Sequence, residues 1–442
     1  MDTAFPSSSR LSSSTKALPS NGAFLINSLS FAEGLKETRN LSSVPRSFFR
    51  CPVDSLESEM IESSSMKTNI LKIAIVAAVS PLAAFTSGAS EISKFDPRMA
   101  VENSQVQGNV KWFDGKYLPI EGKAFKNTAT YFERLPENVT TNVNSGVRDL
   151  KTHTPGMQLR FVTDSKMIAF KWVPRYPNLA MDHMPATGVS GIDVYRLTKN
   201  GWRYVATGRI SKASGGNLSV PWISGEACLV NLPLYNGIKD IQVGVETNAT
   251  ISPPPARASG VTKSVVFYGT SITHGGCASR PGLAFVNILG REIDVPVVNL
   301  GFSGSGKMEM EMSEHISSID ASCYVLDCLW NMDFTMVKNR YEPFIRNLRA
   351  KRPGVPIIMA GQCDVYYEPG GKSRFADKED FTAALYAKLL KEGWKDLYYL
   401  PFDRQHSYDL EGTVDGCHPN DLGMSAMAKA YGEAVKTALK LK

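Results

Sequence analysis

The sequence predicts two structural parts, an antiparallel β-sandwich followed by a parallel α/β domain. Between about residues 110 and 250, short apolar strands alternate with turn residues, a spacing typical of β-sandwiches. After about residue 260, continuous apolar strands alternate with amphipathic helical stretches, which indicates a parallel sheet covered by helices. The prolines Pro253, Pro254 and Pro255 separate the two patterns, because consecutive prolines cannot join the interior of a sheet.

The first half contains several β-rich segments, which we expect to form a jelly-roll-like sandwich over residues 105–252. Its central feature is a hairpin, since the turn Lys199-Asn200-Gly201 separates two alternating segments. Strands are expected over residues 157–164, 167–173, 192–197, 202–206, 227–232 and 241–245.

The second half, residues 260–442, alternates strands with helices. Strands are expected over residues 264–268, 295–300, 323–329, 355–360 and 397–400. Helices are expected over residues 283–292, 337–351, 379–392 and about 423–441. This order predicts an α/β domain with ligand-binding loops at the carboxyl ends of its strands.

The first ninety residues are expected to lie outside the folded domains. Residues 1–65 are Ser-rich without an apolar period, so we expect a disordered extension or an upstream mis-start. Residues 66–90 have two lysines, an apolar run and then small residues, the layout of a secretory signal peptide. We therefore expect export to the periplasm or the extracellular space. A transit peptide and a buried helix of the fold are the alternatives.

Composition excludes several classes of function. The 49 Lys and Arg against 43 Asp and Glu give a formal charge of +6, too weak a basic field to predict nucleic-acid binding. The seven cysteines are too sparse for a disulfide scaffold, and neither a CxxC pair nor an HExxH segment is present, so no metal site is expected. The apolar run before residue 86 is shorter than the ~20 residues that span a bilayer, so no stable membrane span is expected.

Ser271 is the candidate nucleophile. The first strand of the second half leads directly into Gly269-Thr270-Ser271, at the sheet edge where ligands bind in open α/β folds. Glycines on both sides leave the hydroxyl approachable. A turn serine or a helix N-cap is the alternative interpretation. The segment is not a Gly-x-Ser-x-Gly elbow, because Thr273 occupies the fifth place.

His418 is the candidate base, and Asp415 lies three residues before it. A serine hydroxyl needs a neighbouring base, and imidazole is suited to that role near neutral pH. The imidazole in turn needs a partner on its other nitrogen, which Asp415 provides if a short turn brings it back. Asp421 is a candidate cap of the last helix.

Gly304 and Asn331 are candidate donors for an oxyanion hole. Gly304 lies in a Gly-Ser-rich turn after the second strand, where a backbone N–H can approach a substrate closely. Asn331 follows the third strand and carries a neutral amide donor.

These segments, in this order, resemble the SGNH (GDSL-like) hydrolase superfamily over about residues 261–442. The resemblance implies a flavodoxin-like three-layer α/β/α fold and a Ser271–His418–Asp415 triad. It also implies an oxyanion hole made by the amides of Ser271 and Gly304 and by the Asn331 side chain, with no metal and no cofactor. Two departures stand out: Thr270 replaces the usual Asp, and Trp330 replaces the usual Gly before the Asn.

The segment Gly191-Ile192-Asp193-Val194-Tyr195 resembles the Gly-x-Asp-Leu-Tyr signature of a β-rich domain that precedes some bacterial SGNH esterases. This second resemblance implies a secreted carboxylic ester hydrolase that removes short-chain acyl groups, with acetyl expected, from small-molecule or oligosaccharide esters. Residues 181–188 are expected to form a loop that reaches over the active site.

Two alternatives remain open. Residues 301–307 fit the Gly-x4-Gly-Lys part of a nucleotide-binding P-loop, although Met308 stands where a Mg²⁺-binding Ser or Thr is needed. A non-catalytic carbohydrate-binding protein on the same scaffold would use aromatic residues of the first half, most of which core packing explains better. Cys277 and Cys417 are expected near Ser271 and His418, either paired or as separate thiols.

Overall fold

A computed structural model of the chain describes residues 104–362, 367–368, 372–373, 376–401 and 411–442. The expected N-terminal extension and signal peptide, residues 1–65 and 66–90, lie outside the described residues. Within the described ranges, no helix is both long enough and apolar enough to cross a membrane.

The first half forms two antiparallel sheets. One contains β1 (Ser104–Gln107), β2 (Val110–Asp114), β10 (Ile238–Glu246), β5 (Met167–Pro174) and β8 (Gly216–Pro221), in that order. The other contains β11 (Ile251–Ser252), β4 (Gln158–Thr163), β9 (Ala227–Asn231), β6 (Ile192–Thr198) and β7 (Gly201–Gly208), with β3 (Ile120–Glu121) beside β4. Side chains from both sheets, among them Phe161 and Phe170, form one apolar core, as expected of a sandwich.

The predicted hairpin is present. Strands β6 and β7 pair antiparallel from Ile192 opposite Gly208 to Thr198 opposite Gly201. Gly201 has a φ of +85°, a left-handed conformation that glycine adopts without steric cost. The short helices α2 (Ser145–Leu150) and α3 (Ala186–Val189) and a 3₁₀ turn (Gly115–Tyr117) connect strands of this half.

The second half is a five-stranded parallel sheet. Its spatial order is β13 (Val297–Gly301), β12 (Val265–Gly269), β14 (Cys323–Asp327), β15 (Ile357–Ala360) and β18 (Leu397–Leu400). Numbered along the chain this is 2-1-3-4-5, the flavodoxin-like order. Alternate strand residues point to opposite faces and pack against different helices.

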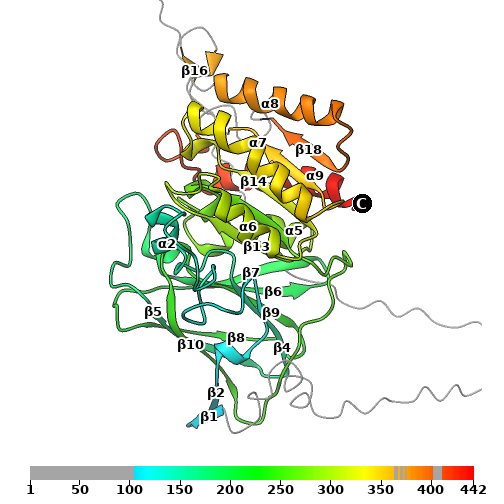
Figure 1. The fold of residues 1–442 in the computed structure, drawn as a ribbon. Helices are drawn as coiled ribbons and strands as arrows, with labels where there is room; N and C mark the ends of the chain where they lie inside the picture. Colours follow the sequence, from blue (N-terminus) through cyan, green and yellow to red (C-terminus); the bar gives the residue numbers. More distant parts are fainter. Residues whose placement is uncertain (1–103, 363–366, 369–371, 374–375, 402–410) are drawn as a thin grey trace, which may run out of the picture. The chain divides into compact units, whose positions relative to one another are not determined.

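Helices cover both faces of this sheet (Figure 1). One face packs against α6 (Met310–Ser318), α7 (Phe334–Lys351) and α8 (Ala376–Lys391), and the other against α5 (Phe285–Glu292) and α9 (Asp421–Leu439). The predicted fold class, an antiparallel sandwich followed by a three-layer α/β domain, is confirmed. The remaining elements are α4 (Ser271–His274), the 3₁₀ turns Pro281–Leu283 and Leu329–Asn331, and the small strand pair β16 (Tyr367–Glu368) and β17 (Lys372–Ser373).

Helix α6 and the start of helix α7 differ from the sequence prediction for local reasons. Helix α6 was not predicted, because its nine residues are mostly polar and leave a weak apolar period. Helix α7 begins at Phe334 rather than Val337, because the Asp333 side chain accepts a hydrogen bond from the backbone N–H of Met336 at 2.8 Å and caps the helix.

The carboxyl ends of three neighbouring strands are in register. Gly269 of β12 lies opposite Gly301 of β13 and opposite Asp327 of β14. The loops that follow these strands carry Ser271, Gly304 and Asn331 in turn, so the fold starts all three loops from the same edge of the sheet.

Candidate active site

Ser271 is the first residue of α4 and is not the N-cap of this helix. Thr270 is the cap, and its hydroxyl accepts a hydrogen bond from the backbone N–H of Ile272 at 3.2 Å. The helix ends after one turn at Gly275, whose φ of +110° favours glycine. The chain therefore presents the Ser271 side chain at the start of a very short helix, with 8% of the residue exposed.

The structure brings Ser271, His418 and Asp415 together. Nε2 of His418 lies 2.8 Å from Oγ of Ser271, although the two residues are 147 positions apart in the sequence. Nδ1 of His418 lies 2.7 Å from Oδ2 of Asp415. A carboxylate only accepts hydrogen bonds, so the proton of this contact is on Nδ1, and Nε2 is the nitrogen that can accept the proton of the serine hydroxyl.

Asp415 is kept ionised by hydrogen bonds. Burial alone would raise its pKa, but bonds from the backbone and side chain of His418 and from the backbone of Cys417 lower it below the usual value. Oδ1 accepts the backbone N–H groups of Cys417 at 2.9 Å and His418 at 2.7 Å. The carboxylate is thereby fixed against the imidazole and remains charged at neutral pH.

The turn that carries His418 is anchored at both ends. The backbone of Val414 donates to the carbonyl of His418 at 3.0 Å, and the backbone of Cys277 donates to the carbonyl of Pro419 at 3.0 Å. Asn420, and not the predicted Asp421, caps helix α9. The Asp421 carboxylate instead accepts hydrogen bonds from the backbone and hydroxyl of Ser279, at 2.8 and 2.5 Å.

Gly304 lies in an exposed turn with a φ of +65°. The backbone N–H groups of Gly304 and Ser271 have no acceptor among the described residues, so both remain available to a substrate oxygen. Asn331 donates one amide proton to the carbonyl of Phe302 at 3.1 Å, which places it against the Gly304 turn and leaves its second proton for another acceptor.

Close packing explains two other glycines of this turn. A Cβ at Gly301 would lie 2.2 Å from the backbone nitrogen of His274, and a Cβ at Gly306 would lie 2.0 Å from the carbonyl oxygen of Gly269. Any side chain at these positions would push the turn away from α4.

Arg134 supports the same turn from the first half of the chain. It is 1% exposed, and its Nη1 donates to the carbonyls of Asn299 at 3.1 Å and Gly301 at 2.6 Å. Its guanidinium carbon lies 4.4 Å from the ring centroid of Phe302. Sequence reasoning missed this residue, because a single arginine in an irregular segment has no local pattern.

Tyr235 also links the first half of the chain to the nucleophile. Its hydroxyl donates to the Ser271 carbonyl at 3.0 Å and is hydrogen-bonded to Ser303. Its ring stacks on His274, with centroids 4.2 Å apart. Burial lowers the pKa of His274 well below its usual value, so this neighbouring histidine stays neutral; its Nε2 bonds the Leu234 carbonyl at 2.8 Å.

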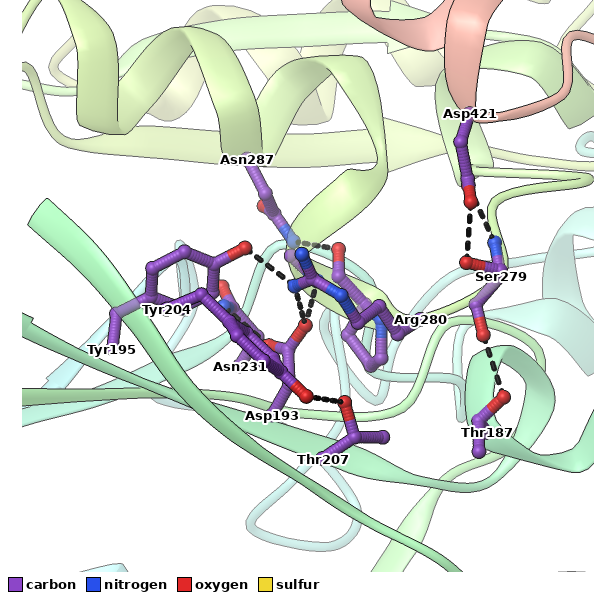
Figure 2. A network of polar contacts seen from close by, with 12 residues as sticks. Thr187, Asp193, Tyr195, Tyr204, Thr207, Asn231, Ser279, Arg280, Asn287 and Asp421 are labelled. Atoms are coloured by element: carbon purple, nitrogen blue, oxygen red, sulfur yellow. Dashed lines mark hydrogen bonds and ion pairs between the residues drawn. The ribbon is translucent and has the colours of Figure 1, made fainter. Parts of the chain in front are cut away.

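A network of polar contacts centred on Asp193 joins the two halves (Figure 2). Asp193 is fully buried, and its Oδ2 accepts Nη1 of Arg280 at 2.7 Å and the backbone N–H of Gly282 at 2.8 Å. Its Oδ1 accepts the Asn231 amide at 2.7 Å. The Tyr195 hydroxyl accepts a second bond from Arg280 at 2.5 Å.

The Gly-x-Asp-Leu-Tyr-like segment therefore has a structural role that sequence reasoning missed. Its Asp193 and Tyr195 hold the loop that contains Arg280, and Ser279 of that loop bonds both Asp421 and Thr187 (Figure 2). The available signal in the sequence was an acidic residue between two apolar residues of a predicted strand, Ile192 and Val194. If such a carboxylate is buried, it requires a polar or charged partner.

The structure also bears on the P-loop segment, on Cys277 and Cys417, and on metal binding. Residues 301–307 do not open a helix as a P-loop does, because α6 starts only at Met310, three residues after Lys307. No disulfide joins Cys277 and Cys417. Burial, together with the charge of Asp415, raises the pKa of the Cys277 thiol to about 12.

In the part of the chain that the structure describes, no group of three His, Cys, Asp or Glu side chains is arranged to hold a metal ion.

Two family models match the chain. The model of the GDSL-like Lipase/Acylhydrolase family matches residues 262–436, and the model described as the N-terminus of Esterase_SGNH_hydro-type matches residues 110–251. No curated protein matched the chain.

Solved structures are similar over both halves. A GDSL-like lipase from Bacteroides ovatus ATCC 8483 is 30% identical, with a TM-score of 0.69, over 76% of this chain and 99% of that chain. The salicylyl-acyltransferase SsfX3 of a tetracycline biosynthetic pathway is 18% identical, with a TM-score of 0.60, over 77% of this chain and 98% of that chain. A family two carbohydrate esterase from Cellvibrio japonicus is 11% identical, with a TM-score of 0.50, over 75% of this chain and 98% of that chain. At these identities, the acyltransferase and the carbohydrate esterase show a shared fold alone. On the match to the Bacteroides structure and the two family models, the chain belongs to the GDSL-like lipase/acylhydrolase (SGNH hydrolase) family, in the form that carries the SGNH-esterase type of N-terminal domain.

Proposed function

We propose that the protein is a serine ester hydrolase in which Ser271 is the nucleophile, His418 the general base and Asp415 the residue that orients the base. The observation that supports this proposal is the continuous hydrogen-bonded chain from Asp415 through His418 to Ser271, with both distances below 3 Å. A protein that only binds carbohydrate has no need for a hydroxyl, an imidazole and an ionised carboxylate in this order.

The reaction proceeds by acyl transfer. Oγ of Ser271 attacks the ester carbonyl while Nε2 of His418 takes the hydroxyl proton. The N–H groups of Ser271 and Gly304 and the Asn331 amide stabilise the oxyanion, each donor lowering the barrier by about 3 kcal/mol. The imidazolium then gives its proton to the departing alcohol oxygen, and water, deprotonated by His418, releases the acid from the acyl-enzyme.

The proposed substrates are short-chain acyl esters, with acetyl esters of carbohydrates as the main class, and the proposed location is outside the cytoplasm. Two features support a large polar alcohol. The side chains of Asp415 and His418 are 42% and 23% exposed, so the site is open at the surface rather than enclosed in an apolar tunnel. Its neighbouring side chains on the first half, Asp182 and His183, are polar and exposed.

Replacing the nucleophile tests the proposal. The variant Ser271→Ala should keep the fold, because the Ser271 backbone makes the contacts to Tyr235 and Gly275. Hydrolysis of 4-nitrophenyl acetate and of an acetylated methyl glycoside should fall by at least about 10⁴-fold. Exposed Ser318, whose hydroxyl donates to the backbone carbonyl of His315 in its own helix, provides the matched control Ser318→Ala. Unchanged turnover by Ser271→Ala would end the assignment.

A further inference from the structure

A tight turn of the first half lies against the candidate active site. The backbones of Met181 and Met184 exchange two hydrogen bonds, of 2.9 and 3.2 Å, and leave Asp182 and His183 at the tip. The Met184 side chain is 2% exposed and belongs to the same apolar cluster of the α/β half as Ile272, the neighbour of the nucleophile. The turn is therefore anchored to the second half of the chain rather than projecting freely into solvent.

The tip of this turn reaches the candidate base. The ring of His183 makes an edge contact with the ring of His418, with centroids 5.9 Å apart and planes at 63°. No other histidine among the described residues makes a ring contact with His418. His183 belongs to the sandwich half by sequence, but its ring contacts His418, the candidate general base.

Asp182 orients the His183 ring. Its Oδ1 accepts a hydrogen bond from Nδ1 of His183 at 2.7 Å and another from the His183 backbone at 3.1 Å. The hydrogen bond from the imidazole is the main reason that the pKa of Asp182 lies below its usual value, so the carboxylate is charged. Nε2 of His183 has no hydrogen-bond partner among the described residues, which leaves a polar atom available to a ligand beside the ring of His418.

The reaction determines which part of an ester substrate lies beside His183. The oxyanion donors come from Ser271, Gly304 and Asn331, so the carbonyl oxygen points toward those loops. The alcohol oxygen must instead lie within reach of His418, which returns the proton to it. A side chain packed against the ring of His418 therefore borders the departing alcohol.

We propose that His183, held by Asp182, is a specificity-determining residue that hydrogen-bonds a hydroxyl group of the alcohol part of the substrate. The class of substrate it favours is an ester whose alcohol carries further hydroxyl groups close to the ester, as a sugar does. This inference rests on the proposed function of Ser271 and His418 and deepens it, because it assigns a part of the substrate to the first half of the chain.

Two acetate esters that differ only in the alcohol test the inference. 4-Nitrophenyl acetate and an acetylated methyl glycoside give the same acetyl-enzyme, so a difference between them arises from the alcohol and not from deacylation. In His183→Ala, kcat/KM for the glycoside acetate should fall about tenfold more than kcat/KM for the nitrophenyl ester, the size expected for one lost hydrogen bond. Because further hydroxyls contribute to ground-state binding, most of the difference should appear in KM.

Related variants separate a binding role from a structural one. His183→Gln keeps a hydrogen-bonding side chain and should recover part of the loss, whereas Asp182→Asn should show the same selective loss as His183→Ala in weaker form. Asn178→Ala is the matched control on the same segment, since its backbone carbonyl accepts the bond from Asn236 while its side chain has no hydrogen-bond partner among the described residues, and it should leave both rates unchanged.

The outcomes distinguish the two proposals. Equal losses on both esters, or no loss on either, would overturn the role of His183 while leaving Ser271 and His418 untouched, provided that Ser271→Ala is inactive. A wild-type protein that hydrolyses neither ester would overturn the proposed function and this inference together.

Discussion

Two carboxylates close to Ser271 occupy opposite environments and illustrate how single residues set the chemistry of the site. Asp415 is partly exposed and bonded to His418, which keeps its pKa below the usual value. Asp327 is 2% exposed at the end of β14, where burial raises its pKa to about 7 against the opposing hydrogen bonds from Thr273 and Tyr431. The first is suited to stabilise an imidazolium, and the second ties α4 to the sheet.

The raised pKa of Asp327 predicts a pH-dependent stability. Between the pKa of an unfolded Asp, near 4, and the folded value of about 7, the folded state holds a proton that the unfolded state has lost. The free energy of unfolding should therefore fall as the pH rises from about 4 to about 7, by up to about 1.4 kcal/mol per pH unit from this group, and then level off. Asp327→Asn should lose this slope and be more stable than the wild type above pH 7.

Urea unfolding at a series of pH values from 4.5 to 8.5 measures this effect. Glu433→Gln, at an exposed position of α9, is the control and should keep the wild-type slope. If Asp327→Asn shows the same pH dependence as the wild type, Asp327 is ionised in the folded protein over the whole range.

At the scale of elements, the candidate site depends on loops that other elements hold in position. The turns after β12 and β13 approach each other through Gly301 and Gly306, and Arg134 bonds the end of β13 from the first half of the chain. The loop with Ser279 and Arg280 bonds the first half through Asp193 and the start of α9 through Asp421. Hydrogen bonds and close packing thus connect elements that are distant in sequence around Ser271.

Breaking the contact between Asp193 and Arg280 should destabilise the protein. Asp193→Asn removes the charge that pairs with Arg280 in a buried setting, where the loss of one partner costs about 3 kcal/mol. Urea denaturation should measure this decrease in the free energy of unfolding, and the double variant Asp193→Asn/Arg280→Met should recover part of the lost stability. Arg203→Met, at an exposed arginine of β7, should change stability by less than about 0.5 kcal/mol.

A loss of under about 0.5 kcal/mol in Asp193→Asn would contradict this account of the network. It would mean that the hydrogen bonds from Gly282 and Asn231, which an amide oxygen also accepts, carry the contact without the charge.

The parts of the molecule that sequence could predict are those with a local pattern. The strands of both halves have apolar periods, and Ser271, Gly304, Asn331 and the pair Asp415 and His418 each lie in a short segment at a strand end or before a helix. Arg134 contacts residues 165 and 167 positions away, and Asp193 contacts Arg280 87 positions away, so nothing next to them in the sequence indicates the partner. Sequence likewise could not supply the hydrogen-bond distances at Ser271, which depend on how the last loop folds back.

At the scale of the whole molecule, the sandwich half does more than precede the α/β half. It supplies buried bonds to the loops of the second half through Arg134 and Tyr235, and it brings His183 to the edge of the candidate site. Two halves that share buried polar contacts and a common site are expected to act as one functional unit.

Covalent labelling can identify the residue that forms the acyl-enzyme, which we propose to be Ser271. The full chain is treated with diisopropyl fluorophosphate, a reagent that traps activated serines, and the modified peptide is sequenced by mass spectrometry. One adduct per chain is expected, on Ser271, with loss of ester hydrolysis in proportion to labelling, and no adduct is expected in His418→Ala. Adduct formation on another residue, or full hydrolytic activity in a protein labelled at Ser271, would rule out Ser271 as the nucleophile.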